Sequence, residues 1–176
     1  MSYLEISHFI QWFFILGLMF MVYKLIKLVG KNANKQAHPN MTYNKKSLST
    51  ISGYSITTNE KIEITKNADF KSLVFFVTPG CIACKEIINN MHQFINKGYN
   101  IVFVSREADN SQLEFYVENL KIHQIPLIIS DKISEENEVS AFPFAILLSK
   151  GLLVEKATIA SNINRVKDVF FRKKAV

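Results

Sequence analysis

Cys81 and Cys84 are the only two cysteines in this chain of 176 residues, and only Ile82 and Ala83 separate them. A Cys-x-x-Cys pair can exchange disulfides, supply two ligands to a metal ion, or consist of two inert buried thiols. Two cysteines form at most one bridge, so the pair is not a framework of structural disulfides. The spacing therefore favours a chemical role, and the flanking segments indicate which one.

The segments around the cysteines predict a strand, a tight turn and a helix. Residues 72–77 form a continuous apolar run, which is typical of a strand covered on both faces. Beyond Cys81 the apolar residues recur at helical spacing until Gly98, which can cap a helix. Cys81 then falls at the first helical turn, where free N–H groups and the helix dipole stabilise a thiolate. We expect Cys81 to attack a client disulfide and Cys84, one turn later, to resolve the mixed disulfide.

A metal site is the main alternative, because zinc-binding domains also use Cys-x-x-Cys. Zinc needs about four ligands, and the sequence has no second cysteine pair. The histidines are scattered along the chain, at His8, His38, His92 and His123. His92 falls about two helical turns beyond Cys84, too far to share an ion. We therefore expect neither a metal nor a cofactor, with metal binding and inert thiols left as the alternatives.

Phe142 and Pro143 open a second apolar strand late in the chain. A proline there withholds a hydrogen-bond donor from the sheet, and the simplest interpretation is a strand's first residue. With a Cys-x-x-Cys pair upstream, the segment also resembles the cis-proline loop that thioredoxin-like proteins set against their cysteines. We expect this second arrangement, with Phe142 and Pro143 binding the backbone of a client peptide.

The remaining patterns predict an α/β domain with a mixed sheet and helices on both faces. A small hairpin is expected in 53–65, and residues 131–140 read as a loop or irregular helix. Ser111 and Glu114 form a potential capping box for one helix, and Asn162 can cap the last. Further strands are expected within 99–107, within 125–130 and on both sides of Ser149–Gly151.

The N-terminal region predicts a membrane anchor at 1–29. Residues from Ile6 to Tyr23 include no Asp, Glu, Lys or Arg, and flanking lysines can extend the bilayer span to 6–29. A cleaved secretory signal would begin with basic residues, whereas Glu5 stands here. A polar linker is expected at 30–48 and the folded domain at 49–176.

Basic residues gather beside this anchor and explain the formal charge of +6. The segment 24–46 has no acidic residue and carries Lys24, Lys27, Lys31, Lys35, Lys45 and Lys46. A basic collar next to an apolar segment meets lipid headgroups, whereas a nucleic-acid-binding domain spreads its cations over a folded face. We therefore expect a lipid partner and no nucleic acid.

Three segments together resemble a known family: the anchor, the block FFVTPGCIACKEI at 75–87 and the closing stretch at 142–170. They are similar to membrane-anchored thioredoxin-fold proteins, and more narrowly to the MauD family of methylamine utilisation accessory proteins. The resemblance implies a redox pair at Cys81 and Cys84 and a cis-proline at Pro143. It also implies an exported client, such as the cysteine-rich small subunit of methylamine dehydrogenase, and a periplasmic domain.

Two departures from thioredoxin leave the direction of the reaction open. Ile82 and Ala83 replace the more usual proline-containing spacer, and Phe75 stands where thioredoxin has a buried acid. The redox potential therefore does not follow from the sequence, so an oxidant, an isomerase and a reductant all stay open.

Membrane orientation is where two lines of inference disagree. The lysines after the span favour a cytoplasmic domain, but large domains cross membranes regardless of nearby charge. We follow the family resemblance and expect a single-pass protein of the inner or plasma membrane with an extracytoplasmic domain, which a membrane redox partner could recycle. The alternatives are a non-catalytic assembly or binding module with the same fold, and a redox sensor on the cytoplasmic face.

Overall fold

The computed structural model describes residues 12, 14–24, 43–95 and 97–171. The chain divides into two compact units, 1–40 and 41–176, and each is described by itself. In the first unit residues 14–24 are helical and exposed. Within the described residues, no helix has both the length and the apolar character that a membrane crossing requires. Much of the predicted anchor, 6–29, and residues 30–42 of the predicted linker lie outside the described residues.

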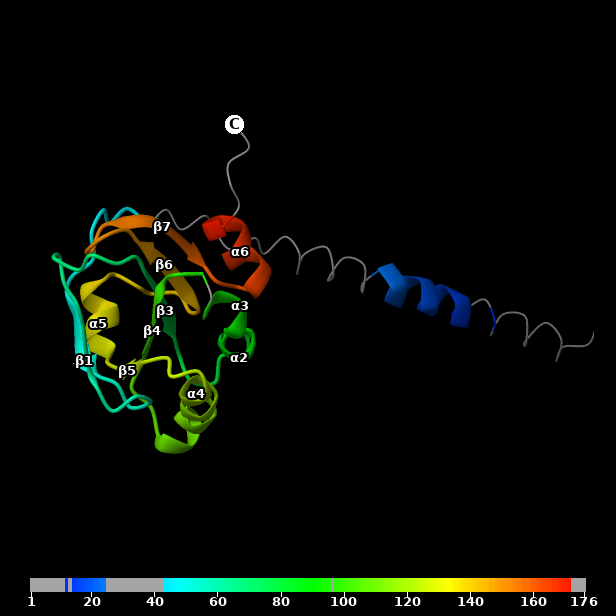
Figure 1. Ribbon diagram of the computed structural model, residues 1–176. Helices are drawn as coiled ribbons and strands as arrows, with labels where there is room; N and C mark the ends of the chain where they lie inside the picture. The colour runs from blue at the N-terminus through cyan, green and yellow to red at the C-terminus, as the bar shows by residue number, and fades with distance from the viewer. Residues whose placement is uncertain (1–11, 13, 25–42, 96, 172–176) are drawn as a thin grey trace, which may run out of the picture. The chain divides into compact units, whose positions relative to one another are not determined.

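A five-stranded mixed sheet forms the centre of the second unit, in the order β5-β4-β3-β6-β7 (Figure 1). The strands are β3 Ser72–Val77, β4 Asn100–Ser105, β5 Leu127–Ile129, β6 Phe144–Leu148 and β7 Val154–Ile159. β3, β4 and β5 run parallel, whereas β6 is antiparallel to both β3 and β7. Every residue of β3 is buried, as its continuous apolar sequence predicts for a strand covered on both faces. The predicted mixed sheet is confirmed.

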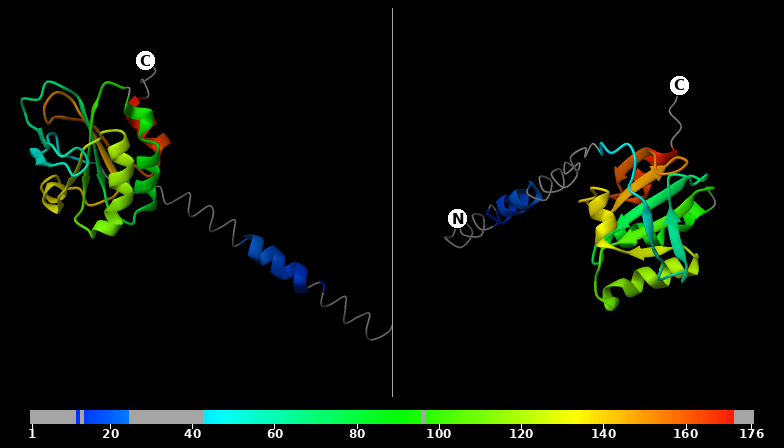
Figure 2. Two further views of the ribbon diagram at one scale, coloured as in Figure 1. Left: turned by 60° about the horizontal axis from the view of Figure 1, so that its bottom comes forward. Right: turned by 90° about the vertical axis from the view of Figure 1, so that its left-hand side faces the viewer.

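One face of the sheet is covered by helices and is called here the redox face (Figures 1 and 2). Its helices are α2 Ile82–Asn89, α3 His92–Ile95, α4 Asn110–Ile122 and α6 Ile163–Phe171. The helix predicted from Cys81 to Gly98 is interrupted: Asn90 ends α2, and its side chain donates to the Glu86 carbonyl at 2.8 Å. Asparagine competes in this way for backbone groups, which is why it favours helix ends.

The opposite face, called here the hairpin face, is covered by a short helix and a two-stranded sheet. The helix is α5 Asp131–Glu136, and the predicted hairpin is confirmed as β1 Ile51–Tyr54 paired antiparallel with β2 Lys61–Ile64. In the right-hand view of Figure 2 the hairpin lies in front of the central sheet and α5 lies beside it. Helices thus lie on both faces, as predicted, but α5 shares its face with the hairpin.

The folded domain includes residues that the sequence places in the linker. Leu48 is only 3% exposed, and its N–H donates to the Leu152 carbonyl at 2.8 Å. The Tyr43 hydroxyl donates to the carbonyl of Asn137 at 2.8 Å. The second unit therefore includes Tyr43, ahead of the boundary expected at Ser49. Tyr43 and Leu48 are isolated among polar residues, so no periodic pattern reveals that they are buried.

Of the two helix caps predicted from the sequence, the one at α4 is wrong and the one at α6 is confirmed. α4 begins after Asp109, so the expected capping box of Ser111 and Glu114 lies inside the helix instead of at its end. At α6 the prediction is confirmed, because the Arg165 N–H donates to the side-chain oxygen of Asn162 at 2.9 Å.

Candidate active site

A three-residue turn, Thr78 to Gly80, carries the chain from β3 to α2. Gly80 has φ of +79°, a conformation that side chains with a Cβ rarely adopt. A Cβ added at Gly80 would meet nothing within 4 Å, so the backbone angle and not space requires glycine. The turn delivers Cys81 to the position that caps α2.

The two cysteines are joined by a disulfide, with their Cα atoms 5.2 Å apart. The backbone N–H of Cys84 donates to the sulfur of Cys81 at 3.2 Å. The Cys81 carbonyl accepts from the Lys85 N–H and so begins the helix. The predicted place of Cys81 at the helix start is confirmed. A free N–H at this position stabilises negative charge on the sulfur.

The two sulfur-bearing residues differ in their access to solvent. Cys84 is completely buried, whereas Cys81 is partly exposed and packs at the margin of the core. Ile82, between them, is 86% exposed. Two inert thiols would both be buried, so this asymmetry argues against that alternative. It leaves Cys81 as the sulfur that another protein can reach.

Phe142 and Pro143 lie at the same edge of the sheet as the cysteine turn. Phe144, the next residue, pairs with Phe76 near the end of β3. The Phe142–Pro143 peptide bond is cis, as predicted. The Pro143 carbonyl accepts from the Ala160 N–H at 2.8 Å, but no hydrogen bond joins the Phe142 backbone to another described residue.

Arg106 is a neighbour of this edge that the sequence did not reveal. Its guanidinium carbon lies 5.4 Å from the centroid of the Phe142 ring, within cation–π range. Its Nε donates to a carboxylate oxygen of Asp131 at 3.1 Å, and its backbone N–H donates to Val77. Arg106 follows β4 and Asp131 begins α5, so only the tertiary fold brings Arg106 to both Asp131 and Phe142.

Tyr116, on α4, contacts the cysteine turn directly. The ring is fully buried, and its hydroxyl donates to the Thr78 carbonyl at 2.8 Å. Burial raises the pKa of Tyr116 to about 12, so the hydroxyl stays protonated and remains a donor at ordinary pH. From the sequence, Tyr116 is only an apolar position of a predicted helix, because no local pattern indicates the hydrogen-bond partner of its hydroxyl.

Comparison with known proteins places this domain by its fold. No protein-family model matches the chain, and no curated protein matches it in sequence. Among solved structures, a thiol-disulfide oxidoreductase from Bacteroides fragilis aligns with a TM-score of 0.54 and 15% identity, covering 70% of this chain and 98% of the other. The thioredoxin domain of a thiol-disulfide oxidoreductase from Bacteroides vulgatus gives 0.52 and 18%, over 69% and 94%. StoA from Bacillus subtilis gives 0.50 and 20%, over 65% and 90%.

The domain has a thioredoxin-like fold. Its structural neighbours include thioredoxin-like thiol-disulfide oxidoreductases, and its Cys81–Cys84 pair has the Cys-x-x-Cys spacing.

Phe75 lies in the core of the redox face, six residues before Cys81. It is completely buried and stacks on Phe103, with ring centroids 5.0 Å apart. None of the Asp or Glu residues that the structure describes is buried. This part of the chain therefore offers Cys84 no buried carboxylate that could accept its proton.

The structure bears on the metal alternative as well. Within residues 43–95 and 97–171, as in the described N-terminal helix, no group of three or more His, Cys, Asp or Glu side chains is placed to hold a metal ion. His92 is exposed at the start of α3, in a different helix from Cys84.

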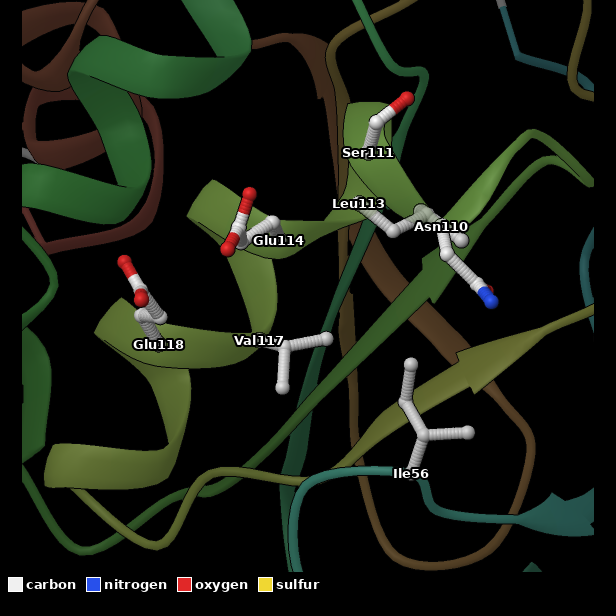
Figure 3. A pocket seen from close by; sticks show the side chains of 7 residues that line it. All are labelled: Ile56, Asn110, Ser111, Leu113, Glu114, Val117 and Glu118. Carbon is white, nitrogen blue, oxygen red and sulfur yellow. The ribbon is translucent and has the colours of Figure 1, made fainter.

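A surface hollow of about 400 Å³ lies between α4 and the residues that follow β1 (Figure 3). Val117 points toward the side where Ile56 lies, whereas the carboxylates of Glu114 and Glu118 point away from it. None of the four predicted site residues lines this hollow. It is a separate feature from the cysteine site.

Proposed function

We propose that the protein is a thiol-disulfide oxidoreductase in which Cys81 exchanges disulfides with a client protein. The observation that carries the proposal is the asymmetry of the pair. Cys81 is partly exposed, caps α2 and accepts a hydrogen bond from the Cys84 N–H, whereas Cys84 is buried. The thioredoxin-like fold supports the same chemistry.

The oxidised pair can take two electrons from a client dithiol in two exchanges. A client thiolate attacks the sulfur of Cys81, the Cys81–Cys84 bond breaks, and Cys84 leaves as a thiolate. A second client thiolate then attacks the client sulfur of the mixed disulfide, and Cys81 leaves as a thiolate. The client gains a disulfide and the protein becomes a dithiol. The same steps in reverse reduce a client disulfide, with Cys81 as nucleophile and Cys84 as the resolving thiol.

We further propose that an extended client segment binds at Phe142 and Pro143. The backbone of Phe142 makes no hydrogen bond to any other residue that the structure describes, and this supports the proposal because an extended peptide needs main-chain hydrogen bonds. Exposed Ile82 and the partly exposed Phe142 ring also offer apolar surface to a client. Arg106, stacked against Phe142, adds a cationic group at the same edge.

The cellular setting is proposed from the sequence. The uncharged run from Ile6 to Tyr23 supports a bilayer span at 6–29. The resemblance to the MauD family supports an extracytoplasmic domain, an exported cysteine-containing client such as a methylamine dehydrogenase small subunit, and a redox partner in the membrane. An oxidising compartment also allows such a disulfide to turn over against exported proteins.

Cysteine variants of the full-length protein test the reaction. Wild type should reduce or oxidise a model disulfide, and Cys81→Ser should fall to the uncatalysed rate because the accessible sulfur is lost. Cys84→Ser should instead accumulate a mixed disulfide through Cys81, visible by mass spectrometry and reversed by dithiothreitol. Client maturation that survives a double Cys81→Ser, Cys84→Ser change would reject the enzyme and favour a binding module.

Thiol labelling in cells tests the location. After mild reduction, a membrane-impermeant reagent should label Cys81 in intact cells or spheroplasts if the domain is extracytoplasmic. Labelling that occurs only after lysis would place the domain in the cytoplasm, as the lysines of 24–35 suggest. The most suitable role would then be a reductase or a redox sensor.

A further inference from the structure

One backbone carbonyl, that of Thr78, receives two hydrogen bonds beside the redox pair. The N–H of Cys81 donates to it at 3.3 Å and the hydroxyl of Tyr116 donates to it at 2.8 Å. The shorter bond comes from α4, far along the chain, and the longer one closes the turn itself. The position of Cys81 is therefore linked to α4 through this oxygen.

A second contact joins the same two helices. The ammonium group of Lys85, one turn after Cys81 on α2, lies 5.2 Å from the centroid of the Phe115 ring on α4. Lys85, which makes this contact, is exposed, whereas Tyr116 is fully buried. The buried hydroxyl is the better candidate for holding the turn, because water does not compete for its hydrogen bond.

The hydroxyl can affect the sulfur in two ways that act in the same direction. A donor on the Thr78 oxygen offsets the negative end of that carbonyl dipole, close to the backbone of Cys81. It also fixes the turn in which the Cys84 N–H reaches the Cys81 sulfur at 3.2 Å. Both effects favour the thiolate form of Cys81 and therefore the reduced state of the pair.

We propose that Tyr116 is a positioning residue for the redox pair, whose hydroxyl holds the Thr78 carbonyl and thereby stabilises the Cys81 thiolate. The biological role of this effect rests on the proposed function. The ionisation of Cys81 and the redox equilibrium, however, are properties of the cysteine pair itself. Removing the hydroxyl should make the pair more reducing.

The chain contains a matched control on the hairpin face. Tyr43 also donates its hydroxyl to a backbone carbonyl, that of Asn137, at 2.8 Å. Its pKa is likewise raised to about 12, first by burial and then by the charge of Glu138. Tyr43→Phe and Tyr116→Phe therefore delete similar bonds, and only the second bond reaches the cysteine turn.

The experiment compares these two variants in the full-length protein. The ionisation midpoint of Cys81 is followed by its alkylation rate against pH, and the redox equilibrium is measured against glutathione buffers. For Tyr116→Phe we expect a midpoint about half a unit higher, and an equilibrium constant shifted about threefold toward the disulfide, or about 14 mV. Tyr43→Phe should leave both unchanged while losing a similar amount of urea stability.

Equal redox behaviour of the two variants would overturn the proposal, whichever way their stabilities change. If Tyr116→Phe does not fold, a fluorinated tyrosine at 116 provides the opposite test. Its stronger hydroxyl donor should shift both readouts the other way, and no shift would also overturn the proposal. Neither readout needs a client, so a protein that does not catalyse exchange with a client could still show the shift. The proposed function and this inference therefore fail separately.

Discussion

The cores on the two faces of the central sheet differ in their content of aromatic residues. On the redox face, aromatic rings pack against each other: Phe75 lies 5.0 Å from Phe103 and 6.1 Å from Phe94, centroid to centroid. On the hairpin face the core is mainly aliphatic. There, polar side chains attach the covering segments to backbone groups. Asn137 accepts from the Ser49 N–H at 2.8 Å and donates to the Ile133 carbonyl at 2.8 Å.

The two cores also differ in whether a substitution there should change the redox equilibrium of the cysteine pair as well as the stability of the fold. Cys84 belongs to the core of the redox face, so a change of packing there reaches the disulfide. The contacts of the hairpin face hold α5 and the segment before β1, with no residue of the Cys81–Cys84 pair in that core. Changes on the two faces should therefore have similar effects on folding and different effects on the cysteines.

The largest expected effect comes from two neighbouring phenylalanines in β3. Phe75 faces the redox core and Phe76 the hairpin core, and both are completely buried. Phe75→Ala and Phe76→Ala should each lower the free energy of unfolding by about 3–5 kcal/mol, measured by urea denaturation. Only Phe75→Ala should also shift the glutathione equilibrium of the pair. An equal redox shift in both variants would remove the distinction between the faces.

An intermediate effect is expected at high pH, because Tyr43 on the hairpin face and Tyr116 on the redox face have raised pKa values. Tyr43 and Tyr116 both have a pKa of about 12, against about 10 in the unfolded chain. Their stabilising contribution is complete below about pH 10 and is lost as pH rises through 12. The loss is at most about 1.4 kcal/mol per pH unit for each tyrosine, and less for partly exposed Tyr43.

Urea midpoints measured from pH 9 to 12 check this prediction. Tyr116→Phe and Tyr43→Phe should each show a shallower fall of stability with pH than wild type. The same slope in all three proteins would mean that neither hydroxyl is protected by the fold.

The smallest effect should follow from Asn137→Ala on the hairpin face. Two side-chain hydrogen bonds are lost, and the free energy of unfolding should fall by about 1–2 kcal/mol. The glutathione equilibrium should stay at the wild-type value, because no residue of the pair is in that core. Thermal unfolding and the redox titration, run on the same sample, decide the matter. A shifted redox equilibrium would show that the two faces are coupled.

Much of the fold follows from local sequence patterns. The continuous apolar run at 72–77 indicates β3, and Asn162 correctly marks the start of α6. The cysteine pair, its place at a helix start and the cis bond before Pro143 were also expected. The strand, the helix starts and the place of Cys81 depend on neighbours in the chain, and short-range patterns record such relations well. The cis bond was instead expected from the resemblance to thioredoxin-like proteins.

The predictions from the sequence failed where a side chain competes for the backbone hydrogen bonds of a helix, or where the burial of a residue depends on a partner far away in the chain. Asn90 interrupts the helix expected to reach Gly98, because its amide bonds back to Glu86. Tyr43 and Leu48 lie in a polar stretch, yet they pack against the domain through Asn137 and Leu152. Isolated apolar residues carry no periodicity, so their burial is not visible in the sequence.

The sequence by itself determined the type of chemistry available, because two cysteines at this spacing before a helical pattern can form a disulfide whose first sulfur is favoured as a thiolate. Only the tertiary structure decided what surrounds that sulfur. The Tyr116 hydroxyl reaches Thr78 from α4, and Arg106 reaches Phe142 from the end of β4. These pairs are far apart in the chain. Packing of helices against the sheet brings them together, and a linear pattern has no means of recording that.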